Sequence, residues 1–333
     1  MSSTSSTGST DDLTTQIIHS ADLGIRRVGT LLLQLGLEPL TTGKIVKKGE
    51  GRIGELDLVF KLETDGIVVV FIIEVSTLSK DQNQKIDHFF SRWSDDGNLE
   101  VVLKEFQMES LETIRIFVDL ARMSKTADTT SIQHHLGRLD IANYVFFRDD
   151  IEYFEDTFST VGKWARSDFL SFVRVPLSRT YVVKEALQFY LEKTPVFSMV
   201  LDVKTLLSIC YISRRLGEQK GYQRILSQGR IRNIGNEIQA GKILAFPNSI
   251  LVNCGDMLTK TPLPPAKCPG RIDVSLPKDY CSCRVVDGQH RLLGFSRFPE
   301  VALSQRHLPV IAFQGLKPAE EAKLFIDINS KQK

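Results

Sequence analysis

Two acidic residues occupy matching positions on a predicted β-hairpin in the first quarter of the chain. Asp57 lies in a stretch of alternating apolar residues, and Glu74 closes the β-branched run 67–75. Thr64-Asp65-Gly66 is a turn sequence, so the two carboxylates are expected near one another on neighbouring strands. Such a pair can hold Mg²⁺, which activates water for attack on a phosphodiester. The alternative is that both are ordinary polar residues at strand ends.

The order of predicted elements around this pair resembles the Mrr-type restriction endonuclease-like fold, the PD-(D/E)xK superfamily. That resemblance puts Asp57 at the first acidic position of the family motif and Glu74 at the second. The catalytic lysine should follow two residues after Glu74, where this chain has Ser76. Lys80 and Lys85 lie just downstream and are the candidates for a migrated lysine. The resemblance implies a Mg²⁺-dependent endonuclease, and Ser76 is the departure from it.

A second candidate site is Asp287-Gly288-Gln289-His290-Arg291, between a predicted strand and a predicted helix. The first N–H groups of a helix lack partners and its dipole is positive there, which suits a phosphate. Gly288 would let the backbone approach closely, Arg291 offers a planar guanidinium, and His290 can donate a hydrogen bond or protonate. Asp287 would hold Arg291 or His290, or assist a metal. The structural alternative is a turn in which Asp287 caps the helix.

This pentapeptide is the signature of the DGQHR domain, which occurs in regulators of DNA sulfur modification and in relatives within other DNA-modification clusters. The chain also has the other motifs of that family in order: Gly221-Tyr222-Gln223-Arg224, Phe246-Pro247-Asn248-Ser249-Ile250 and the segment 324–333. The domain is similar in turn to the ParB/sulfiredoxin fold, in which a related Gly-x-x-Arg turn binds nucleotide phosphates. The resemblance therefore implies that residues 287–291, together with Gln223, Arg224, Asn329 and Lys331, bind ATP or CTP. It leaves open whether the nucleotide is hydrolysed.

The resemblance reaches the last residue, Lys333, whereas members of the family usually continue into further helices. We therefore expect a domain that is truncated at its C-terminus or completed by elements supplied elsewhere. A nucleotide pocket that needed those elements would be inactive in this chain.

The elements that must position these residues fall into two halves. In the first half, apolar periodicity predicts helices over 13–37, 82–106 (broken at 95–98) and 151–173, and strands over 52–62, 67–75, 113–120 and 141–148. In the second half, it predicts helices over 225–239, 289–297 and 318–329, strands over 250–253, 282–286 and 308–313, and a loop over 261–271.

These patterns predict two domains after a disordered Ser/Thr/Gly-rich tail, residues 1–12. Residues 13–175 would form a restriction-endonuclease-like α/β sandwich. Residues 176–333 would form the DGQHR domain, an α+β domain of the ParB/sulfiredoxin type. The boundary is expected within 173–181, which contains Pro176.

The net charge of +2 hides an asymmetry between these halves. Residues 1–175 hold 19 Lys and Arg against 27 Asp and Glu, whereas residues 176–333 hold 23 against 13. The second half therefore carries +10, which favours a polyanion such as DNA as its partner. A solvated basic surface is the alternative.

The cysteines and the hydropathy pattern indicate a cytoplasmic protein. Five cysteines, an odd number in a long chain, suit reduced thiols, and a second close Cys pair for zinc is missing. The longest apolar run is Ile67–Ile73, far short of the roughly 20 residues that span a membrane.

The function expected from these features is a DNA-binding accessory or regulatory protein of a prokaryotic DNA-modification or phage-defence system. Its partners would be DNA and other proteins of the same cluster, with a nucleotide at the Asp287 to Arg291 turn. One alternative is a Mg²⁺-dependent DNA endonuclease acting through Asp57 and Glu74. Another is a partner-binding scaffold in which both sites are vestigial.

Overall fold

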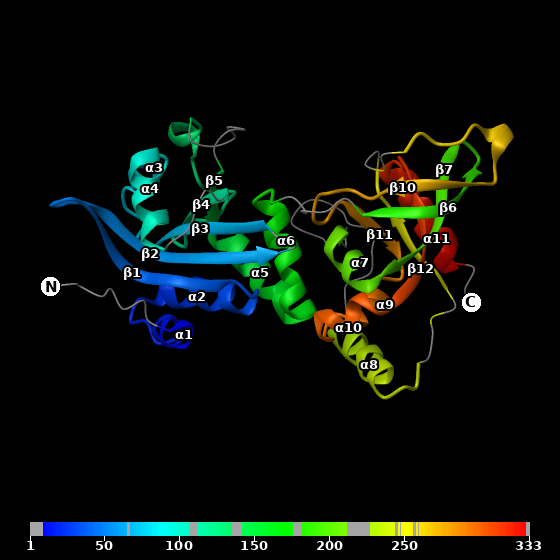
Figure 1. The fold of residues 1–333 in the computed structure, drawn as a ribbon, viewed down its shortest axis with the longest axis horizontal. Coiled ribbons are helices and arrows are strands. Elements are labelled where there is room, and N and C mark those ends of the chain that lie inside the picture. The colour runs from blue at the N-terminus through cyan, green and yellow to red at the C-terminus, as the bar shows by residue number, and fades with distance from the viewer. Residues whose placement is uncertain are drawn as a thin grey trace. The chain divides into compact units, whose positions relative to one another are not determined.

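The computed structural model describes residues 9–64, 67–106, 112–134, 142–175, 181–211, 227–243, 246, 248–255, 258 and 260–330 (Figure 1). The chain divides into two units, Met1–Ser159 and Thr160–Lys333. The division lies ahead of the boundary expected within 173–181, and helix α6 (Ala165–Phe172) is part of the second unit. Every helix in the described segments is too short or too polar to cross a membrane.

The N-terminal unit is built on a mixed five-stranded sheet of order β1-β2-β3-β4-β5. The first three strands are antiparallel neighbours, whereas β3, β4 and β5 run parallel. Helices α1 and α2 cover one face of this sheet and α3 and α4 the other (Figure 1). The elements in chain order are α1 (Thr10–Ile18), α2 (Leu23–Gln34), β1 (Glu38–Lys48), β2 (Gly51–Thr64), β3 (Ile67–Ser76), α3 (Gln82–Trp93), α4 (Asp96–Glu105), β4 (Glu112–Asp119), η1 (Thr130–Ile132), β5 (Asn143–Phe147) and α5 (Arg148–Val161).

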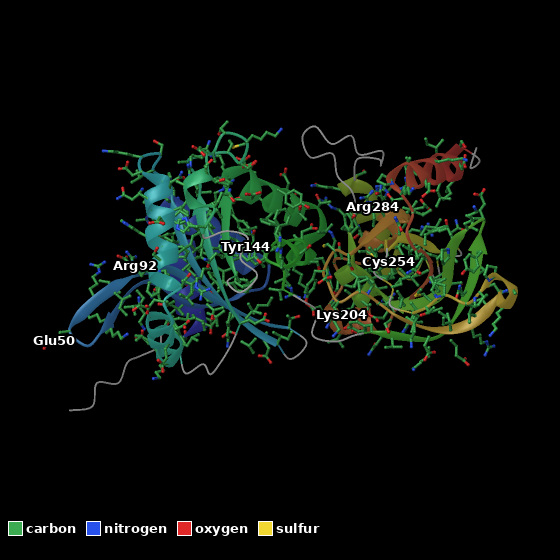
Figure 2. The ribbon with its side chains drawn as sticks, turned by 90° about the horizontal axis from the view of Figure 1, so that it is seen from above. Glu50, Arg92, Tyr144, Lys204, Cys254 and Arg284 are labelled. Atoms are coloured by element: carbon green, nitrogen blue, oxygen red, sulfur yellow. A yellow bond between two sulfur atoms is a disulfide. The ribbon has the colours of Figure 1, made fainter. Side chains whose placement is uncertain are left out.

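Two elements of this unit differ from the sequence prediction. The helix expected over 13–37 is two helices, because Asp22 caps α2 by accepting hydrogen bonds from the Gly24 and Ile25 N–H groups at 2.7 and 3.0 Å. Strand β1 was not predicted, since as an edge strand it is largely exposed and has little apolar alternation. It pairs with β2 in a hairpin whose tip holds Glu50 (Figure 2). The turn residues Asp65 and Gly66 lie outside the described residues.

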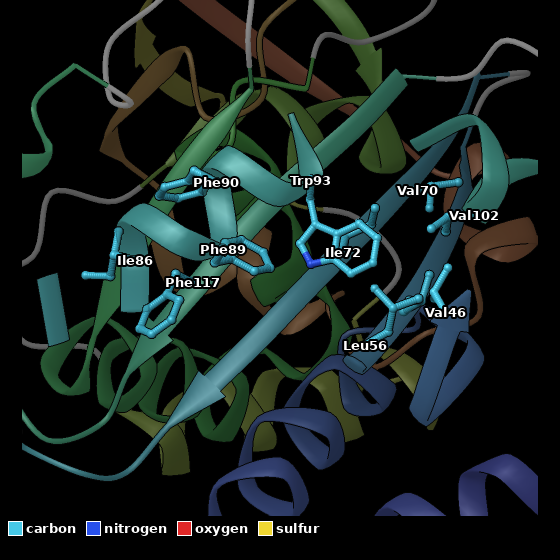
Figure 3. Packing of buried hydrophobic residues seen from close by; sticks show 11 residues of the cluster. Val46, Leu56, Val70, Ile72, Ile86, Phe89, Phe90, Trp93, Val102 and Phe117 are labelled. Carbon is cyan, nitrogen blue, oxygen red and sulfur yellow. The ribbon is translucent and has the colours of Figure 1, made fainter. Parts of the chain in front are cut away.

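The core of this unit lies on both faces of β3, the central strand. All five residues from Val69 to Ile73 are at most 1% exposed, as a β-branched run between covered faces predicts. On the α3/α4 face, Phe89 packs edge-on against Phe90 and Phe117, with ring centroids 5.2 and 5.9 Å away, and Trp93 is fully buried beside them (Figure 3). This packing fixes α3 over the end of the sheet where Asp57 and Glu74 lie.

The C-terminal unit contains a mixed seven-stranded sheet of order β10-β6-β7-β12-β9-β11-β8. Its middle strand β12 runs parallel to β9 and antiparallel to β7. Its elements, after α6 and the preceding turn η2 (Gly162–Trp164), are β6 (Val182–Leu191), β7 (Thr194–Asp202), α7 (Val203–Ile209), β8 (Cys210–Tyr211), α8 (Gln228–Gln239), β9 (Ile250–Asn253), η3 (Pro265–Lys267), β10 (Gly270–Ser275), β11 (Cys283–Asp287), α9 (Gln289–Gly294), α10 (Glu300–Ser304), β12 (His307–Phe313) and α11 (Pro318–Ser330).

The sequence predicted β9, β11, β12 and α11 closely but missed the strands at one side of this sheet. In the hairpin β6–β7, the apolar residues Val182, Leu187, Leu191 and Val200 are exposed and the polar Gln188 is buried, so burial does not follow the apolar pattern. The loop expected over 261–271 ends in strand β10, which pairs with β6 through backbone bonds that the prolines upstream do not prevent. The helix expected over 289–297 is the shorter α9.

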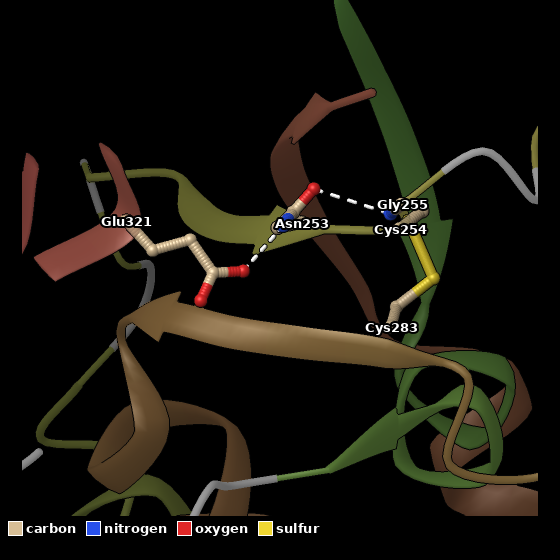
Figure 4. The surroundings of a disulfide bond; sticks show 5 residues. All are labelled: Asn253, Cys254, Gly255, Cys283 and Glu321. Atoms are coloured by element: carbon tan, nitrogen blue, oxygen red, sulfur yellow. Dashed lines mark hydrogen bonds between the residues drawn. A yellow bond between two sulfur atoms is a disulfide. The ribbon is translucent and has the colours of Figure 1, made fainter. Parts of the chain in front are cut away.

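One expectation about the cysteines is wrong. Cys254 and Cys283 form a disulfide, with their Cα atoms 4.2 Å apart (Figure 4). Their strands β9 and β11 are antiparallel and Arg284 pairs with Asn253, so the residue after β9 faces the first residue of β11. A separation of 29 residues in sequence gave no sign of this pairing, which depends on the strand register.

Candidate functional site

The first candidate site lies where β2 and β3 run side by side. Their register pairs Leu58 with Ile73, and one step further along the hairpin stand Asp57 and Glu74. The Asp57 Oδ2 atom accepts a hydrogen bond from the Val75 N–H group at 2.8 Å, which ties it to the neighbouring strand. The structure therefore brings the two acidic residues together at the same place on the sheet.

Burial makes both carboxylates hard to ionise. Loss of water raises the pKa of Asp57 to about 6, against the opposing bond from Val75. Burial, and then the negative charge of Asp57, raise the pKa of Glu74 to about 7. The positive charges of Arg92 and Lys85 act in the other direction on Glu74. The site thus stores unfavourable negative charge at neutral pH, which a bound cation would relieve.

Two basic side chains from α3 lie near Glu74. The Lys85 Nζ atom lies 3.3 Å from the Ser76 hydroxyl, at the position where the family motif has its lysine. Arg92, labelled in Figure 2, covers Gly54: a Cβ atom there would lie 2.7 Å from its Cδ atom. Lys80 is exposed in the segment before α3. Of the two lysine candidates, Lys85 is therefore the one whose contact at Ser76 puts it beside the acidic pair.

The metal-binding capacity of this site is small. Among the described residues, no group of three or more His, Cys, Asp or Glu is arranged to hold a metal ion. Mg²⁺ nevertheless often uses only one or two carboxylates and completes its shell with water and substrate phosphates. Asp57 and Glu74 fit that smaller requirement.

The second candidate site forms where β11 ends at Asp287 and α9 begins. Gly288 caps the helix with φ 93° and ψ 10°, a backbone conformation that L side chains rarely adopt. The Asp287 side chain accepts a hydrogen bond from Arg291 Nη2 at 2.9 Å. Asp287 therefore holds Arg291, one of the roles that the sequence suggested for it, and Gly288 is the capping residue.

Hydrogen bonds join this turn to two distant segments of the chain. Arg291 Nη1 donates to the backbone carbonyl of Asn248, in the Phe246 to Ile250 motif. The His290 Nε2 atom accepts from the Ser227 N–H group at 3.3 Å, and Ser227 in turn caps α8. These bonds fix the turn against both the entry to β9 and the start of α8.

A pocket of about 230 Å³ opens over the turn, and we call it the DGQHR pocket. Its lining residues are Arg230, Ile234, Asn248, Val286, Asp287, Gly288, Gln289, His290, Arg291 and Phe325. Three motifs that are distant in sequence therefore meet in one cavity. Gln223, Arg224, Lys331 and the side chain of Asn329 lie outside the described residues.

Arg230 is a lining residue that the sequence reading missed. It lies in the first turn of α8, and the apolar periodicity of a helix does not distinguish a pocket-lining basic residue from an exposed one. Only the packing of α8 against α9 turns this side chain toward the Asp287–Arg291 turn. With His290 and Arg291, it gives the pocket an excess of basic groups over the single carboxylate of Asp287.

A buried ion pair holds α11, which brings Phe325 to the pocket. Glu321 on that helix is 2% exposed and lies 2.6 Å from Arg284 Nη1 on β11. Asn253 Nδ2 also donates to Glu321, next to the Cys254–Cys283 disulfide (Figure 4). The two strands that end or begin at the pocket are thus joined to α11 and to each other.

The comparison with known families supports the sequence reading of this half. Residues 185–333 match the model of the family DndB, described as DNA-sulfur modification-associated. The match begins within β6 and includes every residue that lines the DGQHR pocket. Neither a curated protein nor a solved structure matches the chain.

Proposed function

We propose that the C-terminal unit binds the phosphates of a nucleotide, ATP or CTP, in the DGQHR pocket. We further propose that the chain serves as a DNA-binding accessory or regulatory protein of a DNA sulfur-modification system. The observation that carries the proposal is the meeting of three separate motifs on one cavity with Arg230, His290 and Arg291. The match of residues 185–333 to a DNA-sulfur modification-associated family supports the setting, and the +10 charge of residues 176–333 supports DNA as the partner.

The chemistry of the pocket suits phosphate oxygens. A guanidinium has five N–H donors, and the bonds of Arg291 to Asp287 and Asn248 use two of them. The remaining donors of Arg291, together with Arg230, can form charge-assisted bonds to a polyphosphate. Asp287 keeps Arg291 in place, so the guanidinium pays little conformational entropy when the anion binds.

Nucleotide binding by wild type and by Arg291→Ala tests this proposal. We expect calorimetry with ATP and CTP to show an affinity lowered at least tenfold in the variant, because charged hydrogen bonds contribute about 1.5 to 3 kcal/mol. Arg297→Ala is the matched control, since Arg297 is an exposed arginine just beyond α9. Arg230→Ala should weaken binding without disturbing the brace between Asp287 and Asn248.

Wild-type protein that binds neither nucleotide would contradict the proposal. An equal loss of nucleotide affinity in Arg291→Ala and Arg297→Ala would also contradict it, because that loss would reflect the net charge of the protein and not binding in the pocket. DNA binding is tested by measuring the affinity for a duplex at several salt concentrations. A slope near zero of log affinity against log salt concentration would mean that no DNA phosphate is neutralised, and would contradict DNA binding.

A second candidate function is a Mg²⁺-dependent DNA endonuclease in the N-terminal unit. The observation that favours it is the contact of Lys85 with Ser76, which puts a positive charge near Glu74. The order of two helices, three antiparallel strands, a helix pair and a parallel strand also supports the restriction-endonuclease-like resemblance. In such a site the carboxylates would hold the metal and Lys85 would stabilise negative charge on the phosphate.

Plasmid cleavage in Mg²⁺ or Mn²⁺ tests this second function. We expect Asp57→Ala and Glu74→Ala to abolish cutting, and Lys85→Ala to slow it about 100-fold, the usual cost of removing a charge-stabilising group. Lys80→Ala is the control, because Lys80 is exposed and should leave the rate unchanged. Both unmodified and phosphorothioate-modified plasmids are tested, and only the absence of cutting on both of them would exclude the nuclease.

A further inference from the structure

A second pocket, of about 260 Å³, lies in the C-terminal unit close to the first, and we call it the aromatic pocket. Its lining residues are Ile238, Ile243, Phe246, Phe295, Arg306, His307, Leu308 and Pro309. The floor is apolar, since Ile238, Phe295 and Leu308 are at most 5% exposed. Arg306 and His307 are exposed at its rim. The pocket thus combines an apolar floor with polar groups at the mouth, as binding sites for small molecules do.

Aromatic rings and a guanidinium plane line this pocket in stacked and edge-on arrangements. The Phe246 and Phe295 rings meet edge-on, with centroids 5.9 Å apart. The Arg306 guanidinium carbon lies 4.9 Å from the centroid of the Phe298 ring and 6.0 Å from that of Phe295. Aromatic side chains and arginine planes are the groups on which nucleobases stack. The chemistry therefore selects a flat, electron-rich ring and not an aliphatic chain.

The two pockets are neighbours along the same elements. Ile234 lines the DGQHR pocket and Ile238 lines the aromatic pocket, one turn further along the same face of α8. One helical turn advances about 5.4 Å. Asn248 and Phe246, two residues apart, divide between the pockets in the same way. A nucleotide likewise joins its phosphates to its base through a single ribose.

The close approach of α8 and α9, which bear on both pockets, depends on two glycines. A Cβ atom on Gly235 of α8 would lie 2.9 Å from the Gly294 carbonyl oxygen, and one on Gly294 would lie 2.6 Å from Ile234 Cγ2. The two helices therefore approach backbone to backbone. A larger residue at either position would push the two helices apart.

We propose that the aromatic pocket receives the base of the nucleotide whose phosphates occupy the DGQHR pocket. The inference rests on the proposed nucleotide site and adds to it the groups that would recognise the base. Phe246 and the Arg306 guanidinium supply the stacking surfaces above a floor that includes Phe295, and His307 supplies a hydrogen-bond donor at the rim. The Phe246 to Ile250 motif then has two tasks, because Phe246 contacts the base while Asn248 fixes Arg291 beside the phosphates.

Calorimetry with ATP, adenosine and inorganic tripolyphosphate tests this inference on the full chain. Phe246→Leu keeps an apolar side chain but removes the ring, and Arg306→Ala removes the guanidinium plane. We expect each to lower the affinity for ATP about tenfold, in keeping with the loss of one base–side chain stack, and to leave tripolyphosphate binding unchanged. Unchanged tripolyphosphate binding also shows that the variants are folded. Arg297→Ala again serves as the control for charge.

The outcomes separate this inference from the proposed phosphate site. If ATP binds no more tightly than tripolyphosphate and neither variant changes the affinity for ATP, the base pocket is overturned and the phosphate site is left intact. Adenosine bound by wild type and lost in Phe246→Leu, without any tripolyphosphate binding, would support the base pocket and overturn the phosphate site. Binding of none of the three probes would overturn both.

Discussion

Gly288→Ala is expected to destabilise the C-terminal unit by about 2 kcal/mol, the cost of a strained backbone position, and to lower nucleotide affinity at least tenfold. The backbone reason is the φ of 93°, which lies beyond even the left-handed region that L residues occasionally visit. The steric reason is that a Cβ atom would lie 2.7 Å from Ile250 Cδ1 and 3.0 Å from Arg291 Nη2. Relief of the second contact moves Arg291 away from Asp287.

Gly241→Ala is a matched control for this change. Gly241 also has a positive φ, 69°, but a Cβ atom there would meet nothing within 4 Å. It should therefore show only the backbone cost, about 1 kcal/mol, and bind nucleotide as wild type does. Thermal unfolding and calorimetry with ATP check both variants. Gly288→Ala protein that matched Gly241→Ala in both measurements would mean that the turn is a passive connection.

Glu74→Gln is expected to stabilise the N-terminal unit at pH 8 and to have little effect at pH 4. Because burial raises the folded-state pKa of Glu74 to about 7 from an ordinary 4.5, the folded protein binds this proton more tightly than the unfolded chain. The resulting stabilisation is fully present below pH 4.5 and is lost as the pH rises through 7. Because the variant cannot lose this proton, we expect its free energy of unfolding at pH 8 to exceed that of the parent by about 2 kcal/mol, after allowance for partial exposure to solvent.

The measurement can be confined to the N-terminal unit. The chain has two tryptophans, Trp93 and Trp164, so a Trp164→Phe background leaves buried Trp93 as the reporter of unfolding in that unit. Glu63→Gln is the control, since Glu63 is exposed near the far end of the same hairpin and its change should stay within about 0.5 kcal/mol.

The same variant reports on the metal. At pH 8, Mn²⁺ should raise the unfolding temperature of the parent protein, because a cation relieves the repulsion between Asp57 and Glu74. Glu74→Gln should lose that response. A parent protein whose stability is flat between pH 4 and pH 8 and insensitive to Mn²⁺ would mean that these carboxylates are solvated strand-end residues.

The sequence predicted most reliably the elements whose apolar pattern is strong. The apolar, β-branched run that forms β3 is stable only when both of its faces are buried, so it could be predicted as a central strand. The observed bounds of β9, β11, β12 and α11 are close to the predicted ones. The edge strand β1 and the hairpin β6–β7 were missed for the opposite reason. In these strands the exposed and buried positions do not follow the apolar pattern of the sequence, so burial leaves little periodic trace in it.

Local sequence by itself determined the identity of the two candidate sites. Gly288 and Arg291 are marked by residue type, because a turn with positive φ selects glycine and a phosphate site selects arginine. Asp57 and Glu74 could be paired from the hairpin alone, since two strands joined by a short turn have a nearly fixed register.

Only the tertiary structure decided which distant side chains join each site. Lys85 was chosen over Lys80 by the packing of α3 on the sheet, and Arg230 entered the DGQHR pocket through the contact of α8 with α9. The Cys254–Cys283 disulfide likewise follows from the register of β9 and β11. Contacts of this kind depend on how whole elements pack together. The pattern of residues along the chain does not specify that packing.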